Sequence, residues 1–280
     1  MSSIQSIQFL YPISGFVVGL LVGLTGVGGG SLMTPLLILL FGVHPATAVG
    51  TDLLYAAVTK SAGSVVHGLN RTVDWRVVRR LATGSIPATV VTIAALGYFD
   101  VKGEGVRALI GAVLAFALLL TAVTLVFRNR IVARYAPLLS SLTPQRIRAL
   151  TIGVGACLGV LVSISSVGAG AIGVTALVLL YPKLPTARIV GSDIVHAVPL
   201  TLVGGIGHWL LGSIDWQVFT ALIVGSIPGI LIGSYAAARF NETALRVVLA
   251  VTLLAVATKL SFGLLPASSD VVAIQASHPR

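Results

Sequence analysis

The feature that most constrains this chain is a set of long stretches almost free of charged residues. Four of them run from Leu81 to Phe99, from Ala108 to Phe127, from Val218 to Ala238 and from Val247 to Leu265. A helix needs roughly 20 apolar residues to cross a hydrocarbon core about 30 Å thick. Only 9% of the 280 residues are charged, whereas soluble domains carry roughly a quarter. We therefore expect an all-α polytopic membrane protein.

The chain repeats itself at an interval of about 140 residues. Gly-Thr-Asp at 50–52 matches Gly-Ser-Asp at 191–193, and Gly-Ser-Ile-Pro at 84–87 recurs at 225–228. Such self-similarity indicates two homologous structural units. We predict a first transmembrane repeat at 1–127, an Arg-rich cytoplasmic linker at 128–145, a second transmembrane repeat at 146–265 and a C-terminal tail at 266–280.

The distribution of Lys and Arg among the loops predicts how the repeats are oriented. The turn at 70–80 carries four Arg and the segment 128–148 carries five, whereas the turn at 211–217 carries none. Cytoplasmic loops are enriched in Lys and Arg, so helix 46–69 runs inward and its counterpart 186–211 runs outward. We therefore expect two inverted-topology repeats, each with a broken or re-entrant short-helix pair plus three transmembrane helices. Secondary transporters often have this construction.

Each short pair is interrupted by a glycine-rich break, TGVGGGS in the first half and SSVGAGA in the second. Irregular backbone at membrane depth is tolerated only where it is buried in protein or lines a cavity. The N-terminus of the following helix offers free N–H groups and the positive end of its dipole to an anion. We predict an anion site between the two tips, formed by Thr25, Gly28, Gly29, Gly30, Ser31, Ser165, Ser166, Gly168 and Gly170.

Two alternatives to this interpretation of the breaks stay open. The glycines can serve only to let helices pack closely, as small residues do in membranes. Each short pair can also either cross the membrane completely or turn back within it.

Four ionisable residues fall inside the apolar helices, where charged groups are functional candidates by default. Lys60 is predicted to be a counter-charge for the anion; alternatively it pairs with Asp52 or reaches the cytoplasmic surface. Asp52 and Asp193 are predicted proton carriers; alternatively they cap backbone donors of the neighbouring broken segment. His196, one turn from Asp193, is a candidate proton relay, or else a neutral hydrogen-bonded histidine.

Several functions lack the residues that they require. The sequence shows no His/Asp/Glu cluster with metal-ligand spacing, no Ser/His/Asp arrangement and no Walker-type loop. We therefore expect no metal, no cofactor, no catalytic residues and no enzymatic activity. The net charge of +10 follows from the Arg-rich loops and indicates membrane orientation rather than a nucleic-acid partner.

A longer pattern connects these motifs to a known family. Gly23, Gly26, Gly28–Gly30 and Pro35 are spaced as G-x-x-G-x-G-G-G-x-x-x-x-P, and HPATAVGT follows at 44–51. With the repeated Gly-Ser-Ile-Pro, this pattern resembles the sulfite exporter TauE/SafE family of permeases across residues 10–265. The resemblance implies a multi-pass protein of the bacterial inner membrane that transports sulfite, sulfonates or related organosulfur anions. The second break departs from the glycine-rich form at Ser165, Ser166 and Ala169, so its tip is expected to bind differently.

The sequence and the resemblance together predict a secondary transporter for a small sulfur-containing oxyanion, held near the bilayer midplane between the two tips. The alternatives are a passive anion channel and a membrane enzyme or assembly factor. The expected partners are the anion and the lipid bilayer. Coupling to protons, to sodium or to exchange is compatible with these residues, as is a homodimer.

Overall fold

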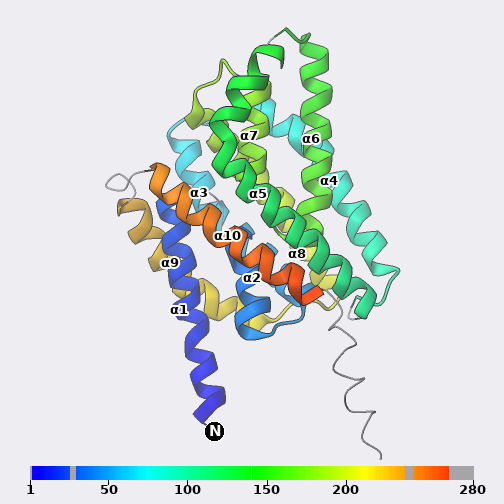
Figure 1. Ribbon diagram of the computed structural model, residues 1–280, viewed down its shortest axis with the longest axis vertical. Coiled ribbons are helices and arrows are strands. Elements are labelled where there is room, and N and C mark those ends of the chain that lie inside the picture. The colour runs from blue at the N-terminus through cyan, green and yellow to red at the C-terminus, as the bar shows by residue number, and fades with distance from the viewer. Residues whose placement is uncertain (1, 26–29, 102, 140, 237–241, 265–280) are drawn as a thin grey trace, which may run out of the picture.

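The computed structural model describes residues 2–25, 30–101, 103–139, 141–236 and 242–264, and these residues form ten helices and no strand (Figure 1). The helices are α1 (Ser2–Thr25), α2 (Gly30–Phe41), α3 (Pro45–Leu69), α4 (Trp75–Gly97), α5 (Glu104–Leu139), α6 (Pro144–Ser165), α7 (Ala171–Leu180), α8 (Thr186–Leu210), α9 (Trp216–Ala236) and α10 (Glu242–Leu264). Among the described residues, α4, α5, α6, α8 and most of α9 are long and apolar enough to cross a membrane. The prediction of an all-α polytopic membrane protein is confirmed.

The helix α5 is longer than the sequence predicted. The apolar stretch ends at Phe127, but the helix continues to Leu139 over 36 residues. Arg is a good helix former, and neither Gly nor Pro occurs between Arg128 and Ala136. The first part of the predicted linker is therefore helical. The predicted tail at 266–280 lies outside the described residues.

The two members of each short pair differ in length, which was not expected. The first members, α1 and α6, have 24 and 22 residues, and 22 residues measure about 33 Å. Only α2, with 12 residues, and α7, with 10, are short. The first members are longer because polar residues at their N-termini add helical turns to the apolar stretch.

Helix packing follows the sequence repeat. Helix α1 lies along α9, and α6, its repeat counterpart, lies along α4. The glycines of the repeated Gly-Ser-Ile-Pro motif sit in these two contacts. A Cβ atom on Gly225 would overlap the carbonyl of Pro12, and one on Gly84 would overlap the carbonyl of Ile152. These two glycines therefore serve close helix contact.

The repeated Asp-Trp motif joins the two halves. Asp74 caps α4 by accepting from the N–H of Arg76 and Val77, and Asp215 caps α9 in the same way. The N–H of Asp74 donates to Ser192 Oγ at 2.8 Å, and the N–H of Asp215 donates to Thr51 Oγ1 at 3.1 Å. Equivalent positions thus make equivalent contacts across the halves. The inverted orientation of the halves in a membrane stays a prediction.

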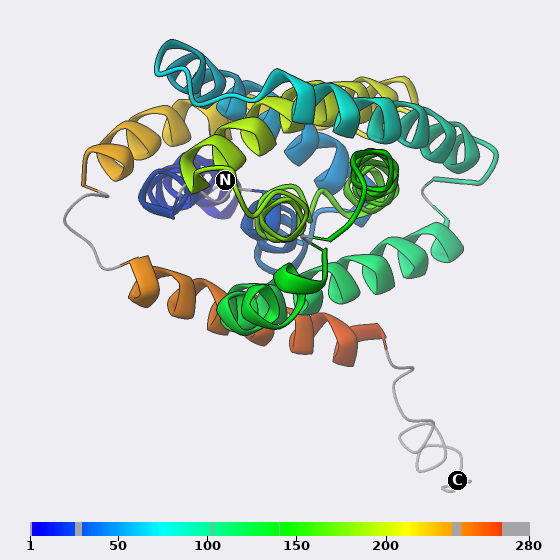
Figure 2. The same cartoon turned by 90° about the horizontal axis from the view of Figure 1, so that it is seen from above.

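The two short helices occupy the centre of the molecule. Seen from above, α2 and α7 lie between a layer containing α3, α4 and α8 and a layer containing α5 and α10 (Figure 2). Helix α2 packs against α3 and α10, and α7 packs against α8 and α5. Both helices that begin at a glycine break are therefore surrounded by protein.

Candidate functional site

The second glycine break is a buried turn. Helix α6 ends at Ser165, α7 begins at Ala171, and all five residues between them are buried. Gly168 and Gly170 have φ angles of 125° and 132°, a region that residues with a Cβ atom rarely adopt. Ser165 Oγ accepts from the N–H of Val167 at 3.2 Å. The glycines are therefore required here by the turn itself.

The start of α7 leaves backbone donors free. No side chain caps this helix, and its first backbone bonds run from Val174 to Gly170 at 2.8 Å and from Gly173 to Gly168 at 3.3 Å. Within the described residues, the N–H groups of Gly170, Ala171 and Ile172 find no acceptor. Free N–H groups at the positive end of a helix are the elements of an anion site.

Lys60 reaches this break from the other half of the chain. Its Nζ donates to the carbonyl oxygen of Ala169 at 3.5 Å, and the residue is 8% exposed. Its ammonium group is thus buried rather than at a surface. In the part of the chain that the structure describes, it makes no ion pair within 4 Å with Asp52 or Asp193. Lys60 acts electrostatically on both carboxylates without contacting either.

Asp52 holds the helix that follows the first break. Its Oδ2 atom accepts from the N–H of Thr34 at 3.2 Å and from Thr34 Oγ1 at 2.5 Å. Its Oδ1 atom is buried and has no partner among the described residues. Asp52 thus bonds through one oxygen to the fifth residue of α2, and the side chain of Ser166 in the second break also acts on its carboxylate. The capping and proton-carrier roles of Asp52 stay predictions.

Asp193 lies against the helix that follows the second break. A Cβ atom on Gly173, in the first turn of α7, would overlap Asp193 Oδ1. This oxygen is buried and unpartnered within the described chain. The two aspartates therefore take equivalent places, Asp52 against α2 and Asp193 against α7. Neither Asp193 nor Asp52 reaches a surface, since both are at most 1% exposed.

His196 is buried beside α4. Its Nε2 atom lies 2.8 Å from Ser85 Oγ, and its Nδ1 atom has no partner in the described residues. The repeat places Tyr55 at the position of His196 and Ser226 at that of Ser85, and Ser226 acts electrostatically on Tyr55, whose hydroxyl has no hydrogen-bond partner among the described residues. A polar pair thus occupies equivalent positions in each half, and it is hydrogen-bonded in the second.

The first break is described only at its edges. Gly28 and Gly29 lie outside the described residues. Helix α1 ends at Thr25 and α2 begins at Gly30. The surroundings of Gly30 are likewise not described. Ser31 is buried. The structure therefore gathers Lys60, Ser165, Ser166, Gly168 and Gly170 around the second break, with Asp52 and Asp193 against the short helices.

Two contacts of this site were not predicted from the sequence. Thr34 binds Asp52, but its repeat counterpart is Val174, so no repeated motif marks it. Ser85 binds His196 and belongs to the repeated Gly-Ser-Ile-Pro motif, which was a usable signal. No three His, Cys, Asp or Glu side chains of the described residues come together as metal ligands.

Comparison with known proteins shows which family the chain belongs to. The profile described as "Sulfite exporter TauE/SafE" matches residues 11–260. The chain belongs to the sulfite exporter TauE/SafE family. No solved structure matches it.

Curated relatives of this TauE/SafE protein are named as transporters. It is 38% identical over 249 residues to the probable membrane transporter protein YjnA of Bacillus subtilis (strain 168), covering 89% of this chain and 97% of that protein. It is 30% identical over 235 residues to a probable membrane transporter protein of Xylella fastidiosa (strain 9a5c), covering 82% and 85%. With its apolar helices, this TauE/SafE protein is a multi-pass membrane transporter.

Proposed function

We propose that this transporter is a secondary carrier for a small sulfur-containing oxyanion, sulfite or a short sulfonate, in the cell inner membrane. One observation carries the proposal: the buried ammonium group of Lys60 lies at the second break, beside backbone N–H groups that have no acceptor. Buried charges are normally paired, so this positive cluster suits an anionic ligand. The family description supports the sulfur chemistry.

The donors of this cluster suit an oxyanion. A lysine ammonium group has three N–H donors, and Ala169 accepts only one of them at 3.5 Å. The remaining donors and the free N–H groups of α7 can bind several oxygens of one tetrahedral or pyramidal anion. Ser166, whose side chain also interacts with Asp52, adds a buried hydroxyl donor at the same turn.

The two aspartates support coupling to protons. With Lys60 they leave one excess negative charge in a buried region, and a bound anion increases it. Burying unbalanced charge is costly, so protonation of a carboxylate favours anion binding. Asp52 and Asp193 each keep one unpartnered oxygen that can take the proton. His196, one turn from Asp193, offers a relay.

Transport into proteoliposomes tests this function. We expect purified protein to move sulfite or taurine faster than empty vesicles, and Lys60→Ala to slow transport by about tenfold or more, because hydrogen bonds to charged groups contribute about 1.5–3 kcal/mol. The control is Lys183→Ala, at an exposed turn residue, which should transport normally. No flux of either anion above empty vesicles, or full activity in Lys60→Ala, contradicts the proposal.

The aspartates distinguish a carrier from a passive channel. We expect an imposed proton gradient to drive accumulation of the anion, and Asp193→Asn to abolish this accumulation while retaining exchange of internal for external anion. A channel gives passive flux that depends only on the anion gradient and on voltage, and that survives Asp193→Asn. That second pattern would identify the protein as a channel.

A further inference from the structure

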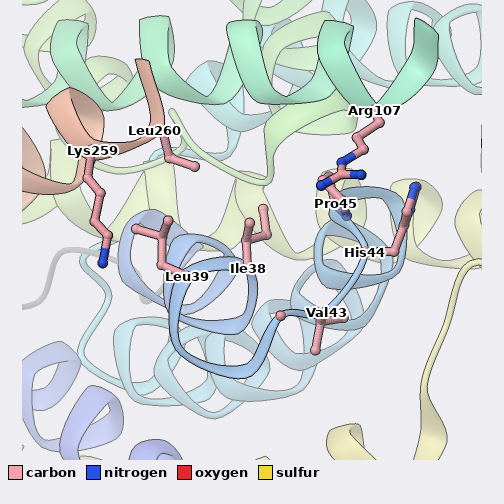
Figure 3. A pocket seen from close by; sticks show the side chains of 9 residues that line it. Ile38, Leu39, Val43, His44, Pro45, Arg107, Lys259 and Leu260 are labelled. Carbon is pink, nitrogen blue, oxygen red and sulfur yellow. The ribbon is translucent and has the colours of Figure 1, made fainter. Parts of the chain in front are cut away.

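A cavity lined by both apolar and basic side chains lies away from Lys60. It measures about 340 Å³ and opens where α2 ends and α3 begins (Figure 3). Its lining includes Leu39 from α2, His44 from the α2–α3 connection, Pro45 from the start of α3, Arg107 from α5 and Lys259 from α10. The cavity thus lies between the central short helix and the layer formed by α5 and α10.

The charge of this lining is positive. In Figure 3, Arg107 reaches toward Pro45 at one end of the cavity, and Lys259 reaches past Leu39 at the other. No carboxylate is among the lining residues that the structure describes. Outside the lining, Glu104 Oε1 pairs with Arg107 Nη1 at 3.2 Å. Because this pair is exposed, it contributes at most about 1 kcal/mol, and a stronger anion can displace Glu104.

His44 adds a donor with a defined tautomer. Its Nδ1 atom accepts from the N–H of Ala46 at 3.4 Å, so a neutral ring carries its proton on Nε2. That Nε2 atom is buried and has no partner in the described part of the chain. The positive end of α3, which begins at Pro45, faces the same region.

We propose that this cavity is a separate binding site for a small oxyanion, held by Arg107 and His44, with Lys259 adding positive charge from the other end of the cavity. Lys60 lies 15 positions beyond Pro45 on α3, which corresponds to about 22 Å along a helix. The cavity and the Lys60 cluster are therefore two separate sites along α3. Under the predicted orientation, the cavity faces the outside of the membrane, where it captures an anion or receives one.

A phosphate group on a lipid shares this chemistry, but the position of the cavity favours a free anion. The cavity is lined by α2 on one side and by α5 and α10 on the other, and α5 and α10 pack against each other. A lipid that approached through these two helices would have to separate them, whereas a free anion can enter beside the exposed side chains of Arg107 and Lys259.

Binding of radiolabelled sulfite to the purified protein tests the proposal. Binding is measured in the Lys60→Ala variant, in which the Lys60 site is removed and only this cavity is expected to bind. It is also measured in the wild type, where two sites are expected. We expect Arg107→Gln with Lys259→Gln to weaken binding to this site by about tenfold, since each exposed cation contributes up to about 1 kcal/mol. Glu104→Gln should strengthen it severalfold by releasing Arg107. High salt should remove both effects, because the Debye length is about 3 Å at 1 M.

The control is the double variant Lys183→Gln with Arg188→Gln, which removes two exposed cations, one just before α8 and one in its first turn, and should bind as its parent does. Unchanged binding in the Arg107 and Lys259 variant, or unchanged binding in Glu104→Gln, overturns the proposal. The proposal is also overturned if the protein in phosphatidylcholine nanodiscs binds no sulfite, while labelled phosphatidylglycerol binds through Arg107 and Lys259. Sulfite binding here in a protein that transports no anion would overturn the proposed function and leave this site standing.

Discussion

At Lys60, one charged side chain from the first half of the chain meets a turn of the second half. Its Nζ atom bonds to a carbonyl 109 positions away, and no acidic residue of the described chain lies within 4 Å of it. A buried cation in this position requires a compensating charge nearby. Asp52 and Asp193 provide that charge at longer range, and an anion at the tip can provide it directly.

A substitution at Gly173 tests whether the position of Asp193 against α7 matters for transport. A methyl group on Gly173 would overlap Asp193 Oδ1, the end of a side chain that can rotate away. We expect Gly173→Ala to fold normally but to reduce proton-driven uptake severalfold, because the carboxylate leaves its place against α7. Gly153→Ala on α6 is the control, since a methyl group there meets open space. Equal uptake by the two variants would show that the position of Asp193 is unimportant.

A substitution at Thr34 tests whether the bond between Asp52 and α2 stabilises the protein. Thr34→Val keeps the shape of the side chain and removes the hydroxyl bond to Asp52. Loss of a buried bond to a charged group destabilises by about 1–3 kcal/mol, which should lower the unfolding temperature in detergent. In Asp52→Asn, the same substitution should cost less because the two residues are coupled. Additive effects, or an equal loss in the exposed control Thr252→Val, would contradict this role.

At the scale of elements, apolar stretches determine where the helices lie, and their ends depend on other forces. The predicted helices at 46–69 and 186–211 match α3 and α8 to within one residue. Helix α5 exceeds its prediction because the Arg-rich segment from Arg128 to Ala136, which has no Gly or Pro, continues the helix beyond the apolar stretch. The bonds from Asp52 to Thr34 and from His196 to Ser85 join residues 18 and 111 positions apart. Only helix packing decides such pairs, so the sequence indicated the polar residues but not their partners.

The contact between α4 and α6 depends on Gly84. A Cβ atom there would overlap backbone atoms of Ile152 and Ala156, which cannot rotate away as a side chain can. We expect Gly84→Ala to destabilise the protein by about 1–3 kcal/mol, the usual cost of overpacking, seen as a lower thermal midpoint in detergent. Gly68→Ala, where a methyl group meets nothing within 4 Å, should be neutral or stabilising. A Gly84→Ala midpoint as high as that of Gly68→Ala would show that these helices can separate without cost.

At the scale of the whole molecule, the two halves are joined by contacts that occur at equivalent positions. The Asp74–Ser192 bond ties the cap of α4 to α8 of the other half, and the Asp215–Thr51 bond ties the cap of α9 to α3. The two short helices start in the interior, one from each half. This arrangement suits an inner site that is reached from both sides if the halves are inverted, as the Arg distribution predicts.

Cysteine labelling in whole cells tests the inversion. In a Cys157→Ala background, which has no other cysteine, Arg76→Cys and Leu210→Cys place a thiol at exposed positions near the cap of α4 and the end of α8. We expect an impermeant maleimide to label the residue at 210 in intact cells, and the residue at 76 only after permeabilisation. Labelling of both residues from one side would contradict the predicted orientation.

The binding of an anion by Lys60 and the second break is tested most directly by calorimetric titration of sulfite into purified protein at high salt, where the exposed cations Arg107 and Lys259 are screened. The wild type should bind sulfite, and Lys60→Ala should bind at least about tenfold more weakly, while Lys183→Ala should bind as the wild type does. Equal affinity in all three proteins would show that the second break and Lys60 do not hold the anion.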